Sequence, residues 1–276
     1  MKQVVVITGL ADGMGRLTAK MLAEAGCCIA GFDVDAGRLA SLKKELDDIG
    51  GDHLLETIDI TDRKKILQFR DRVLGKYGQV DTVLSNVGIG FFSPFEEADL
   101  DKALKCLDIN VIGASAIFQA FLPSMRERRK GKLIAMSSLV GRIPFPFEAI
   151  YTASKFAITG LMLSMRLEVK PFGIDVAIIE PAQVSTSFAA KIHVLPPEGS
   201  LYRDRARRFI ERDNELIKTA PTPEFAAKRI VKVVMAKRMS LFNQIDFMST
   251  FFLWINQVLP RRIRDFILVN YMDIKV

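Results

Sequence analysis

Short apolar segments alternate with longer amphipathic ones along most of the chain. Several of the short segments are apolar on both faces, which is typical of parallel strands covered by helices on each side. They predict strands at Gln3–Ile7, Cys28–Phe32, Leu54–Thr57, Val80–Leu84, Lys132–Met136 and Asp175–Ile179. The longer segments predict helices at Met14–Ala25, Ala36–Ile49, Asp62–Tyr77, Leu100–Arg129, Ala149–Lys170 and Thr222–Ala236. This alternation predicts an α/β fold, with a doubly wound parallel sheet between two helical layers.

The pattern indicates a single domain over residues 1–238, in which about 185–220 form a long substrate loop. Residues 239–276 form an apolar C-terminal helical extension that we expect to pack on the core or on a partner subunit. This segment falls short of the about 20 apolar residues that a spanning helix needs. Peripheral membrane contact through 240–276, with Arg261, Arg262 and Arg264 near lipid headgroups, is the alternative interpretation.

The charge of the chain indicates which classes of partner this domain is expected to bind. The net charge is +7, and the basic clusters Arg126–Lys130, Arg203–Arg212 and Arg261–Arg264 are scattered and interrupted by acidic residues. We interpret these clusters as solvated helix faces and expect no nucleic-acid partner.

The cysteines and histidines predict neither a disulfide framework nor a metal site. Cys27, Cys28 and Cys106 lack metal-ligand spacing and fit a reducing compartment, and His53 and His193 lie far apart in the sequence. The N-terminal apolar run leads directly into a glycine turn, so we interpret it as a buried strand and not as a signal peptide. We therefore expect a cytoplasmic protein, with membrane association only through the extension.

A glycine-rich turn, TGLADGMG, joins the first predicted strand to the first helix. Gly9, Gly13 and Gly15 allow the backbone to approach a pyrophosphate at the helix N-terminus. The spacing differs from the general G-x-G-x-x-G fingerprint, so the position between strand and helix carries the prediction of a dinucleotide site.

Acidic residues near this turn favour NAD over NADP. Asp33 ends the second strand, where a carboxylate accepts hydrogen bonds from ribose hydroxyls and repels a 2′-phosphate. Asp12 adds negative charge within the turn. Asp35 competes for the ribose role, although it also suits the N-cap of the following helix. Arg16 is the nearby residue that would favour a phosphate.

The segment YTASK places Tyr151 and Lys155 four residues apart, on one face of a predicted helix. An ammonium beside a phenol favours the phenolate, so we predict that Lys155 lowers the pKa of Tyr151 and makes it a general acid/base. By itself, the pair would suit an exposed amphipathic helix equally well.

Taken together, these segments resemble the short-chain dehydrogenase/reductase family over about the first 190 residues and the helix near 221–224. The matching motifs follow the family's order: TGLADGMG at 8–15, Asp33, DIT at 59–61, SNVG at 85–88, Asn110 in INVIG, SS at 137–138, YTASK at 151–155 and PAQVST at 181–186. Ser85 and Val87 depart from the usual Asn-Asn-Ala-Gly. Ala182 replaces the usual glycine after Pro181, which alters the backbone beside the nicotinamide.

The resemblance implies hydride transfer with a nicotinamide cofactor. Its implied catalytic residues are Asn110, Ser138, Tyr151 and Lys155. Ser138 would bind the substrate oxygen, while Asn110 would hold a water that passes protons towards Lys155. The implied cofactor-binding residues are Gly9, Asp12, Gly13, Met14, Gly15, Asp33, Asp59, Ile60, Asn86, Val87, Gly88, Tyr151, Lys155, Pro181, Val184 and Thr186. Family members commonly assemble as dimers or tetramers, so we expect a homodimer or homotetramer.

Aromatic residues in the predicted loops favour a hydrophobic substrate. The segments 90–95, 142–149 and 185–220 are expected to ring the pocket with Phe91, Phe92, Phe145, Phe147, Phe188 and Ile192. Apolar surface of this kind suits a steroid-, retinoid- or lipid-like alcohol or ketone, although some of these rings would only pack the loops. We therefore predict an NAD-dependent alcohol dehydrogenase/ketone reductase. The alternative is a non-catalytic NAD(H)-binding regulator or scaffold on the same fold.

Overall fold

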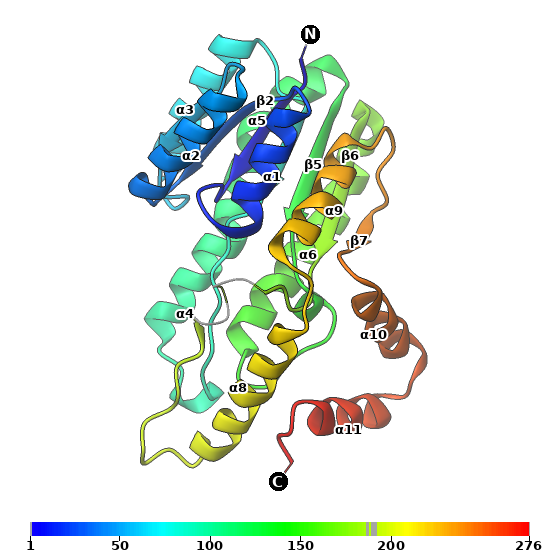
Figure 1. Ribbon diagram of the computed structural model, residues 1–276. Helices are drawn as coiled ribbons and strands as arrows, with labels where there is room; N and C mark the ends of the chain where they lie inside the picture. The colour runs from blue at the N-terminus through cyan, green and yellow to red at the C-terminus, as the bar shows by residue number, and fades with distance from the viewer. Residues whose placement is uncertain (1, 186–187, 189–191, 276) are drawn as a thin grey trace.

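A parallel sheet forms the centre of the molecule (Figure 1). The computed structural model describes residues 2–185, 188 and 192–275. The sheet is seven-stranded, in the order β3-β2-β1-β4-β5-β6-β7. The strands are β1 Val4–Thr8, β2 Cys28–Asp33, β3 Leu54–Thr57, β4 Thr82–Ser85, β5 Gly131–Met136, β6 Ile174–Glu180 and β7 Phe242–Gln244. Reversal of the strand order at β1 and β4 opens a crevice at the carboxyl ends of these strands, where ligands bind in such folds.

Helices cover both faces of the sheet, as the sequence predicted. One face packs against α1 Gly13–Glu24, α2 Ala36–Ile49 and α9 Pro223–Met235. The other packs against α3 Arg63–Tyr77, α5 Ala114–Arg128 and α6 Ala149–Val169. Each predicted strand has apolar residues in both layers; Val5 and Val6, for example, are each 0% exposed and belong to opposite cores. This two-sided burial explains the nearly continuous apolar runs of the strands.

The predicted helix Leu100–Arg129 is interrupted at its centre. It consists of α4 Leu100–Leu107, a π-helical turn Asp108–Gly113 and α5. By length and composition, Leu100–Arg128 is the one helix among the described residues that could cross a membrane, and 50% of its most apolar window is buried inside the protein. Such burial is what a core helix shows. The π turn matters because it carries Asn110.

The sequence patterns missed a strand and a helix of the described chain, β7 and α8. The strand β7 lies within the segment assigned to the extension, yet it pairs with β6 and completes the sheet. It is only three residues long and mostly polar, so it has no apolar run. The helix α8, Arg203–Lys218, occupies part of the predicted loop 185–220. Its buried residues are few, namely Ala206, Phe209 and Asp213, so its apolar period is hidden among charged side chains.

The basic cluster on α8 is not simply a solvated helix face, as the sequence suggested. The guanidinium groups of Arg205, Arg208 and Arg212 donate to backbone carbonyls in the C-terminal segment, at Ile274, Asp273, Lys275 and Tyr271. Tyr271 is the last residue of α11, Arg261–Tyr271, where a helix leaves carbonyl acceptors unsatisfied, and the other three carbonyls belong to the segment that follows this helix. The arginines therefore fasten the end of the chain to α8.

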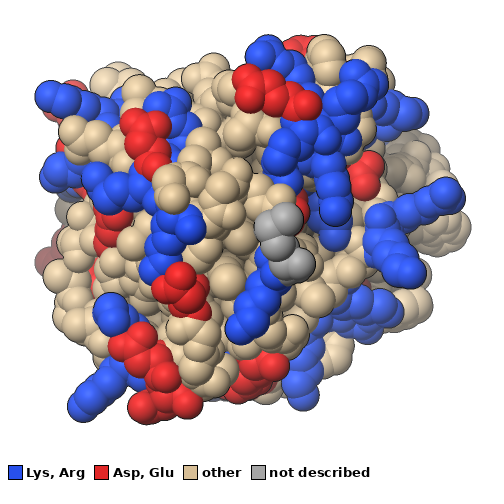
Figure 2. Space-filling model, turned by 90° about the horizontal axis from the view of Figure 1, so that it is seen from above, with Lys and Arg blue, Asp and Glu red and all other residues tan. Residues whose placement is uncertain are grey.

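The extension forms two helices, α10 Phe247–Val258 and α11 Arg261–Tyr271, which project from the lower end of the sheet in Figure 1. On α10 an apolar stripe faces outwards and contains Phe247, Phe251, Trp254 and Val258, which are 79%, 41%, 58% and 54% exposed. The opposite, upper end of the molecule, seen in Figure 2, carries intermixed positive and negative side chains.

Candidate active site

The glycine turn forms a cradle beside the end of β1. A Cβ atom on Gly15 would lie 2.2 Å from the carbonyl oxygen of Gly9, whereas one on Gly13, at φ +53°, would meet nothing within 4 Å. The turn is thus tight on its inner side and open on its outer side, and it leads into the N-terminus of α1. These features fit a pyrophosphate held by backbone N–H groups.

Residues after β4 brace this turn. Asn86 donates from Nδ2 to the carbonyl oxygen of Gly9 at 2.8 Å, and Thr8 Oγ1 accepts from the backbone N–H groups of Asn86 and Val87. A Cβ atom on Gly88 would lie 3.3 Å from Lys155 Nζ, so a side chain there would crowd the ammonium. The contacts of Asn86 that brace the turn are thus present although Val87 departs from the usual family motif.

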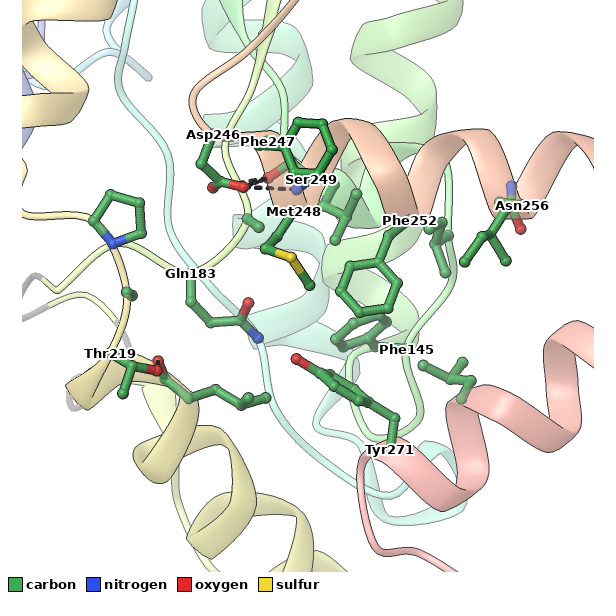
Figure 3. A pocket seen from close by; sticks show the side chains of 18 of the residues that line it. Phe145, Gln183, Thr219, Asp246, Phe247, Met248, Ser249, Phe252, Asn256 and Tyr271 are labelled. Carbon is green, nitrogen blue, oxygen red and sulfur yellow. Dashed lines mark hydrogen bonds between the residues drawn. The ribbon is translucent and has the colours of Figure 1, made fainter.

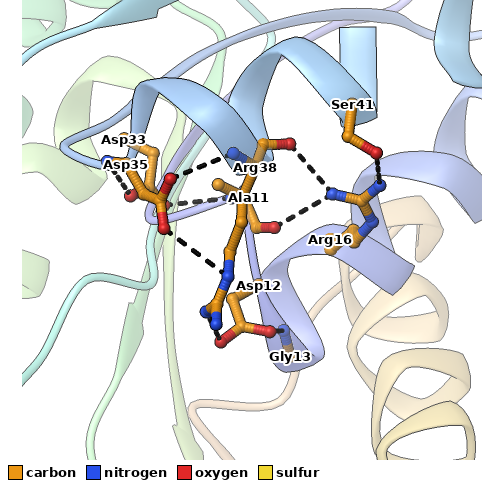
Figure 4. A network of polar contacts seen from close by, with 8 residues as sticks. All are labelled: Ala11, Asp12, Gly13, Arg16, Asp33, Asp35, Arg38 and Ser41. Carbon is orange, nitrogen blue, oxygen red and sulfur yellow. Dashed lines mark hydrogen bonds and ion pairs between the residues drawn. The ribbon is translucent and has the colours of Figure 1, made fainter. Parts of the chain in front are cut away.

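Asp33 lies at the carboxyl end of β2 with its carboxylate held by the backbone (Figure 4). Its two oxygens accept from the N–H groups of Ala11 and Asp35, each at 3.0 Å. Asp35 caps α2 by accepting from Arg38 N, so its predicted capping role is confirmed. Asp33 is consequently the better placed carboxylate beside the glycine turn.

Two arginines lie near this carboxylate. Arg16 donates to the carbonyl oxygens of Ala11 and Arg38 and to Ser41, and it forms an ion pair with Glu45. All of these contacts are with other residues of the protein, so the Arg16 guanidinium is already engaged within it.

Arg38 was overlooked in the sequence. It pairs with Asp12 and Asp35 and is half exposed at 50%, on the first turn of the helix that follows Asp33 (Figure 4). The one feature of the sequence that could have pointed to Arg38 is that a basic residue stands five positions after Asp33.

The DIT segment at 59–61 follows β3 and is stabilised by hydrogen bonds within the segment itself. Asp59 accepts from the N–H and hydroxyl of Thr61, and the hydrogen bond from the Thr61 N–H lowers its pKa. Asp62, and not Asp59, caps α3. The side chain of Ile60 is buried against Gly113.

Met14 lies in the first turn of α1, half-buried, and Pro181 and Val184 are buried after β6. Thr186 lies outside the described residues.

Ser138 and Tyr151 meet at the carboxyl end of β5. Ser138 Oγ donates weakly to the carbonyl oxygen of Pro181 at 3.4 Å and begins the 3-10 turn Leu139–Gly141. Its hydrogen bond with Tyr151 lowers the pKa of that phenol, but burial and the nearby Glu148 raise the pKa well above the ordinary value. Ser137 points the other way, to Thr159 Oγ1 at 2.9 Å, as strand alternation predicts.

Lys155 does not lower the pKa of Tyr151, contrary to the sequence prediction. Its Nζ lies 5.5 Å from the centroid of the Tyr151 ring and donates to the carbonyl oxygen of Met136 at 2.9 Å. Burial lowers the pKa of Lys155 to about 8. Helical spacing brought the two side chains to one face, but burial dominates both pKa values because each group is desolvated.

Asn110 joins these residues from the π turn. Its Oδ1 accepts from Ile89 N at 2.8 Å, and its Nδ2 donates to Ile89 O and to Ser154 Oγ at 2.8 and 3.0 Å. Ser154 is adjacent to Lys155 on α6. The π turn thus ties the loop after β4 to the helix that carries Tyr151, a placement typical of π turns at functional sites.

A cavity of about 830 Å³ lies where the sheet end meets the extension. Leu139, Ala182 and Gln183 line it from the turns after β5 and β6, and Phe252 and Tyr271 line it from α10 and α11 (Figure 3). Of the predicted pocket residues, Phe145 lines this cavity, Phe92 and Phe147 pack with Phe209 in a separate cluster, and Phe188 lies 6.0 Å from the Tyr151 ring. The contribution of the extension was not apparent from the sequence, because it depends on how α10 and α11 fold back.

Comparison with known proteins agrees with this geometry. A family model described as short chain dehydrogenase matches residues 3–194. The chain belongs to the short-chain dehydrogenase/reductase family.

It is 30% identical over 240 residues to a 3-ketodihydrosphingosine reductase of Bacteroides thetaiotaomicron, covering 85% of this chain and 84% of that protein. It is 34% identical over 205 residues to the human 17-beta-hydroxysteroid dehydrogenase type 1, covering 71% of this chain and 61% of that protein.

Solved structures share the fold. A short-chain dehydrogenase/reductase of Burkholderia phymatum in complex with NAD superposes with a TM-score of 0.81 at 22% identity, covering 92% of each chain. A metagenomic short-chain oxidoreductase in complex with NADP has a TM-score of 0.69 at 24% identity, covering 88% of this chain and 95% of that one. The fold therefore accommodates a nicotinamide dinucleotide of either kind.

Proposed function

We propose that this short-chain dehydrogenase/reductase interconverts a secondary alcohol and its ketone on a lipophilic substrate, with NAD(H) as the preferred cofactor. The observation that carries the proposal is the meeting of Ser138, Tyr151 and Lys155 beside the glycine cradle. Leu139, which follows Ser138 in the chain, helps to line a cavity whose walls are mainly apolar side chains. Its volume of about 830 Å³ suits a steroid- or lipid-sized molecule.

In this proposal Tyr151 exchanges a proton with the substrate oxygen, and Ser138 hydrogen-bonds the same oxygen. Bound nicotinamide would donate or accept the hydride at the substrate carbon. Because burial and Glu148 raise the pKa of Tyr151, the phenol is protonated at neutral pH. A protonated phenol can supply the proton that a carbonyl oxygen takes up when a ketone is reduced.

Replacing Tyr151 tests the acid/base role. We expect Tyr151→Phe to reduce ketone turnover by roughly 10²–10⁴-fold, the usual contribution of a general acid, while NADH binding measured by fluorescence is retained. Tyr77→Phe is the matched control, because Tyr77 hydrogen-bonds to the carbonyl of Asp52, far from the cavity. Full turnover in Tyr151→Phe would refute the mechanism. Firm NADH binding without turnover of any apolar ketone by the wild-type protein would favour the non-catalytic alternative.

Replacing Asp33 tests the cofactor preference. A carboxylate that hydrogen-bonds to the ribose and repels a 2′-phosphate should make the wild-type protein bind NADH more tightly than NADPH. In Asp33→Asn we expect this ratio to fall by about tenfold, since hydrogen bonds to charged groups are the stronger ones. Fluorescence titration with both cofactors measures it, with Asp35→Asn as the neighbouring control. A wild-type preference for NADPH would contradict the NAD assignment and direct attention to Arg38.

A further inference from the structure

The wall of the cavity contains a positive charge that the proposed reaction does not use. Arg264 on α11 is partly buried and lines the cavity, whereas Arg261 and Arg262 on the same helix are exposed. In the sequence these three arginines form one basic cluster, which the fold divides. Most of the surrounding wall is apolar, so the charge of Arg264 is screened less than it would be in water.

Asn256 on α10 fixes one side of this guanidinium group. Arg264 Nη1 donates to the carbonyl oxygen and to Oδ1 of Asn256, at 2.7 and 2.9 Å. Asn256 Nδ2 donates in turn to the carbonyl oxygen of Arg142 at 3.3 Å. Arg142 ends the 3-10 turn that Ser138 begins. Arg264 is therefore held in place from both helices of the extension and from the turn after β5, and little ordering is needed for it to bind a ligand.

The other donors of Arg264 have no partner among the described residues. Its Nε is buried without a hydrogen bond, and Nη2 forms none either. The adjacent carboxylate, Asp265, pairs with Arg261 instead, at 3.8 Å. Nε and Nη2 form the edge with which a guanidinium group binds both oxygens of a carboxylate. Because an unpaired buried donor costs free energy, a ligand carboxylate at this edge would be stabilised.

The acidic group in the cavity wall is already engaged. Asp246 is the one carboxylate among the described residues that line the cavity, and both of its oxygens accept from Ser249 at the start of α10 (Figure 3). Arg229 on α9 is a second cation of this wall, and it lies over the Phe225 ring at 5.3 Å. Arg229 and Arg264 form no ion pair within the part of the chain that the structure describes. The wall thus favours an anionic ligand.

The position of Arg264 indicates the shape of this ligand. Gln183 and Asn256 lie on opposite sides of the cavity in Figure 3, with apolar side chains between them in this view. Gln183 lies near Pro181, whose carbonyl oxygen accepts a hydrogen bond from Ser138, and Asn256 holds Arg264. An anionic group at Arg264 is therefore separated by an apolar stretch from a reacting oxygen at Ser138.

We propose that Arg264, held by Asn256 and assisted by Arg229, binds a carboxylate group of the substrate at the end of the molecule remote from the reacting carbon. The substrate is then a keto acid or hydroxy acid whose two functional groups are separated by an apolar chain or ring system. Two free donors on one edge match the two oxygens of a carboxylate. This inference rests on the proposed function and specifies its substrate class.

The main test compares methyl ketones that carry a carboxylate at the far end with their methyl esters, which differ in charge but little in shape. Reduction of 11-oxododecanoate, of its shorter and longer homologues, and of their methyl esters is measured with the full chain and NADH or NADPH. For the wild-type protein we expect kcat/KM of the best acid to be roughly ten- to a hundredfold higher than that of its ester, since hydrogen bonds to charged groups are strong.

Substitutions in the cavity wall assign this preference. Arg264→Gln should bring the acid-to-ester ratio close to one, and Arg264→Lys, which keeps the charge, should restore part of it. Arg229→Gln should reduce the ratio. Arg262→Gln, at an exposed position of the same helix, is the matched control and should preserve it. A loosened wall would affect acid and ester alike, so the ratio reports the charge and not the integrity of the cavity.

The same experiment separates the two proposals. Equal reduction of acid and ester by the wild-type protein, or an acid preference that persists in Arg264→Gln, would refute the carboxylate site and leave the proposed function intact. Failure to reduce any of these ketones with either cofactor would count against the proposed function. In that event a binding measurement decides the fate of the carboxylate site.

Calorimetric titration with decanoate supplies that measurement, because it needs no turnover. We expect the wild-type protein and Arg262→Gln to bind decanoate about tenfold more tightly than Arg264→Gln does. Decan-2-one, which is neutral, should bind equally to all three proteins. Absence of decanoate binding by the wild-type protein, or equal affinity in Arg264→Gln, would overturn the inference.

Discussion

At the scale of single residues, burial determines the chemistry of this site more than sequence spacing does. Tyr151, Lys155 and Glu148 are each at most 8% exposed, and desolvation is the largest cause of each pKa shift. Desolvation disfavours whichever form is charged. It therefore raises the pKa of the phenol and the carboxyl and lowers that of the ammonium.

The raised pKa of Glu148 predicts a specific dependence of stability on pH. The carboxyl titrates near 4.5 ordinarily and at about 8 in the folded protein. Between these values the folded state binds more protons than the unfolded state, so the Glu148 contribution to stability falls as pH rises through this window. Glu148→Gln should remove this loss, which is about 1.4 kcal/mol for each unit of pKa shift.

Urea unfolding of the wild-type protein and of Glu148→Gln at about pH 5 and about pH 8 measures this difference. The variant should gain stability relative to the wild-type protein at the higher pH, while Glu215→Gln should follow the wild type. Parallel pH profiles for wild type and Glu148→Gln would mean that the carboxyl does not titrate in this window.

At the scale of elements, arginine side chains on α8 hold the C-terminal segment through hydrogen bonds. Arg208 and Arg212 donate to the carbonyls of Asp273, Lys275 and Tyr271. Tyr271 in turn lines the cavity. The position of α11, and with it one wall of the cavity, depends on these contacts.

Removal of one arginine should loosen this wall. In Arg212→Ala we expect the amides of α11 to exchange hydrogen about tenfold faster, because a charge-assisted hydrogen bond is lost from a segment of low local stability. Hydrogen exchange monitored by mass spectrometry measures the change. Arg207→Ala is the control, since Arg207 pairs with Asp204. Unchanged exchange in α11 would show that apolar packing alone holds the segment.

At the scale of the whole molecule, apolar residues remain exposed on two separate faces. One comprises α4, the π turn and α6, with Leu104, Ile112, Phe156 and Leu167 at 66%, 52%, 45% and 63% exposed. The other is the stripe on α10 that includes Trp254. Groups of exposed apolar side chains mark interaction surfaces. Membrane contact through the second face stays a prediction.

We expect the first face to join two copies of the chain. Sedimentation velocity of the wild-type protein should give a mass of at least a dimer, and Ile112→Glu should shift it towards the monomer, because a buried unpaired charge is costly. Val258→Glu on α10 is the control and should leave the mass unchanged. A monomeric wild-type protein would contradict the expected assembly.

The sequence by itself determined the layered α/β architecture and predicted a dinucleotide site at the glycine turn. Burial of a strand on both faces and the periodicity of a helix are patterns that a short stretch of sequence shows. The glycine turn and YTASK are likewise each contained within a few consecutive residues. Only the tertiary structure decided the pKa values, the division of the central helix, and the walls of the cavity. His193 and Asp213 come from separate segments, so the approach of His193 Nε2 to within 3.5 Å of Asp213 Oδ2 could not be read along the chain. Desolvation likewise depends on what packs around a group and not on its neighbours in sequence.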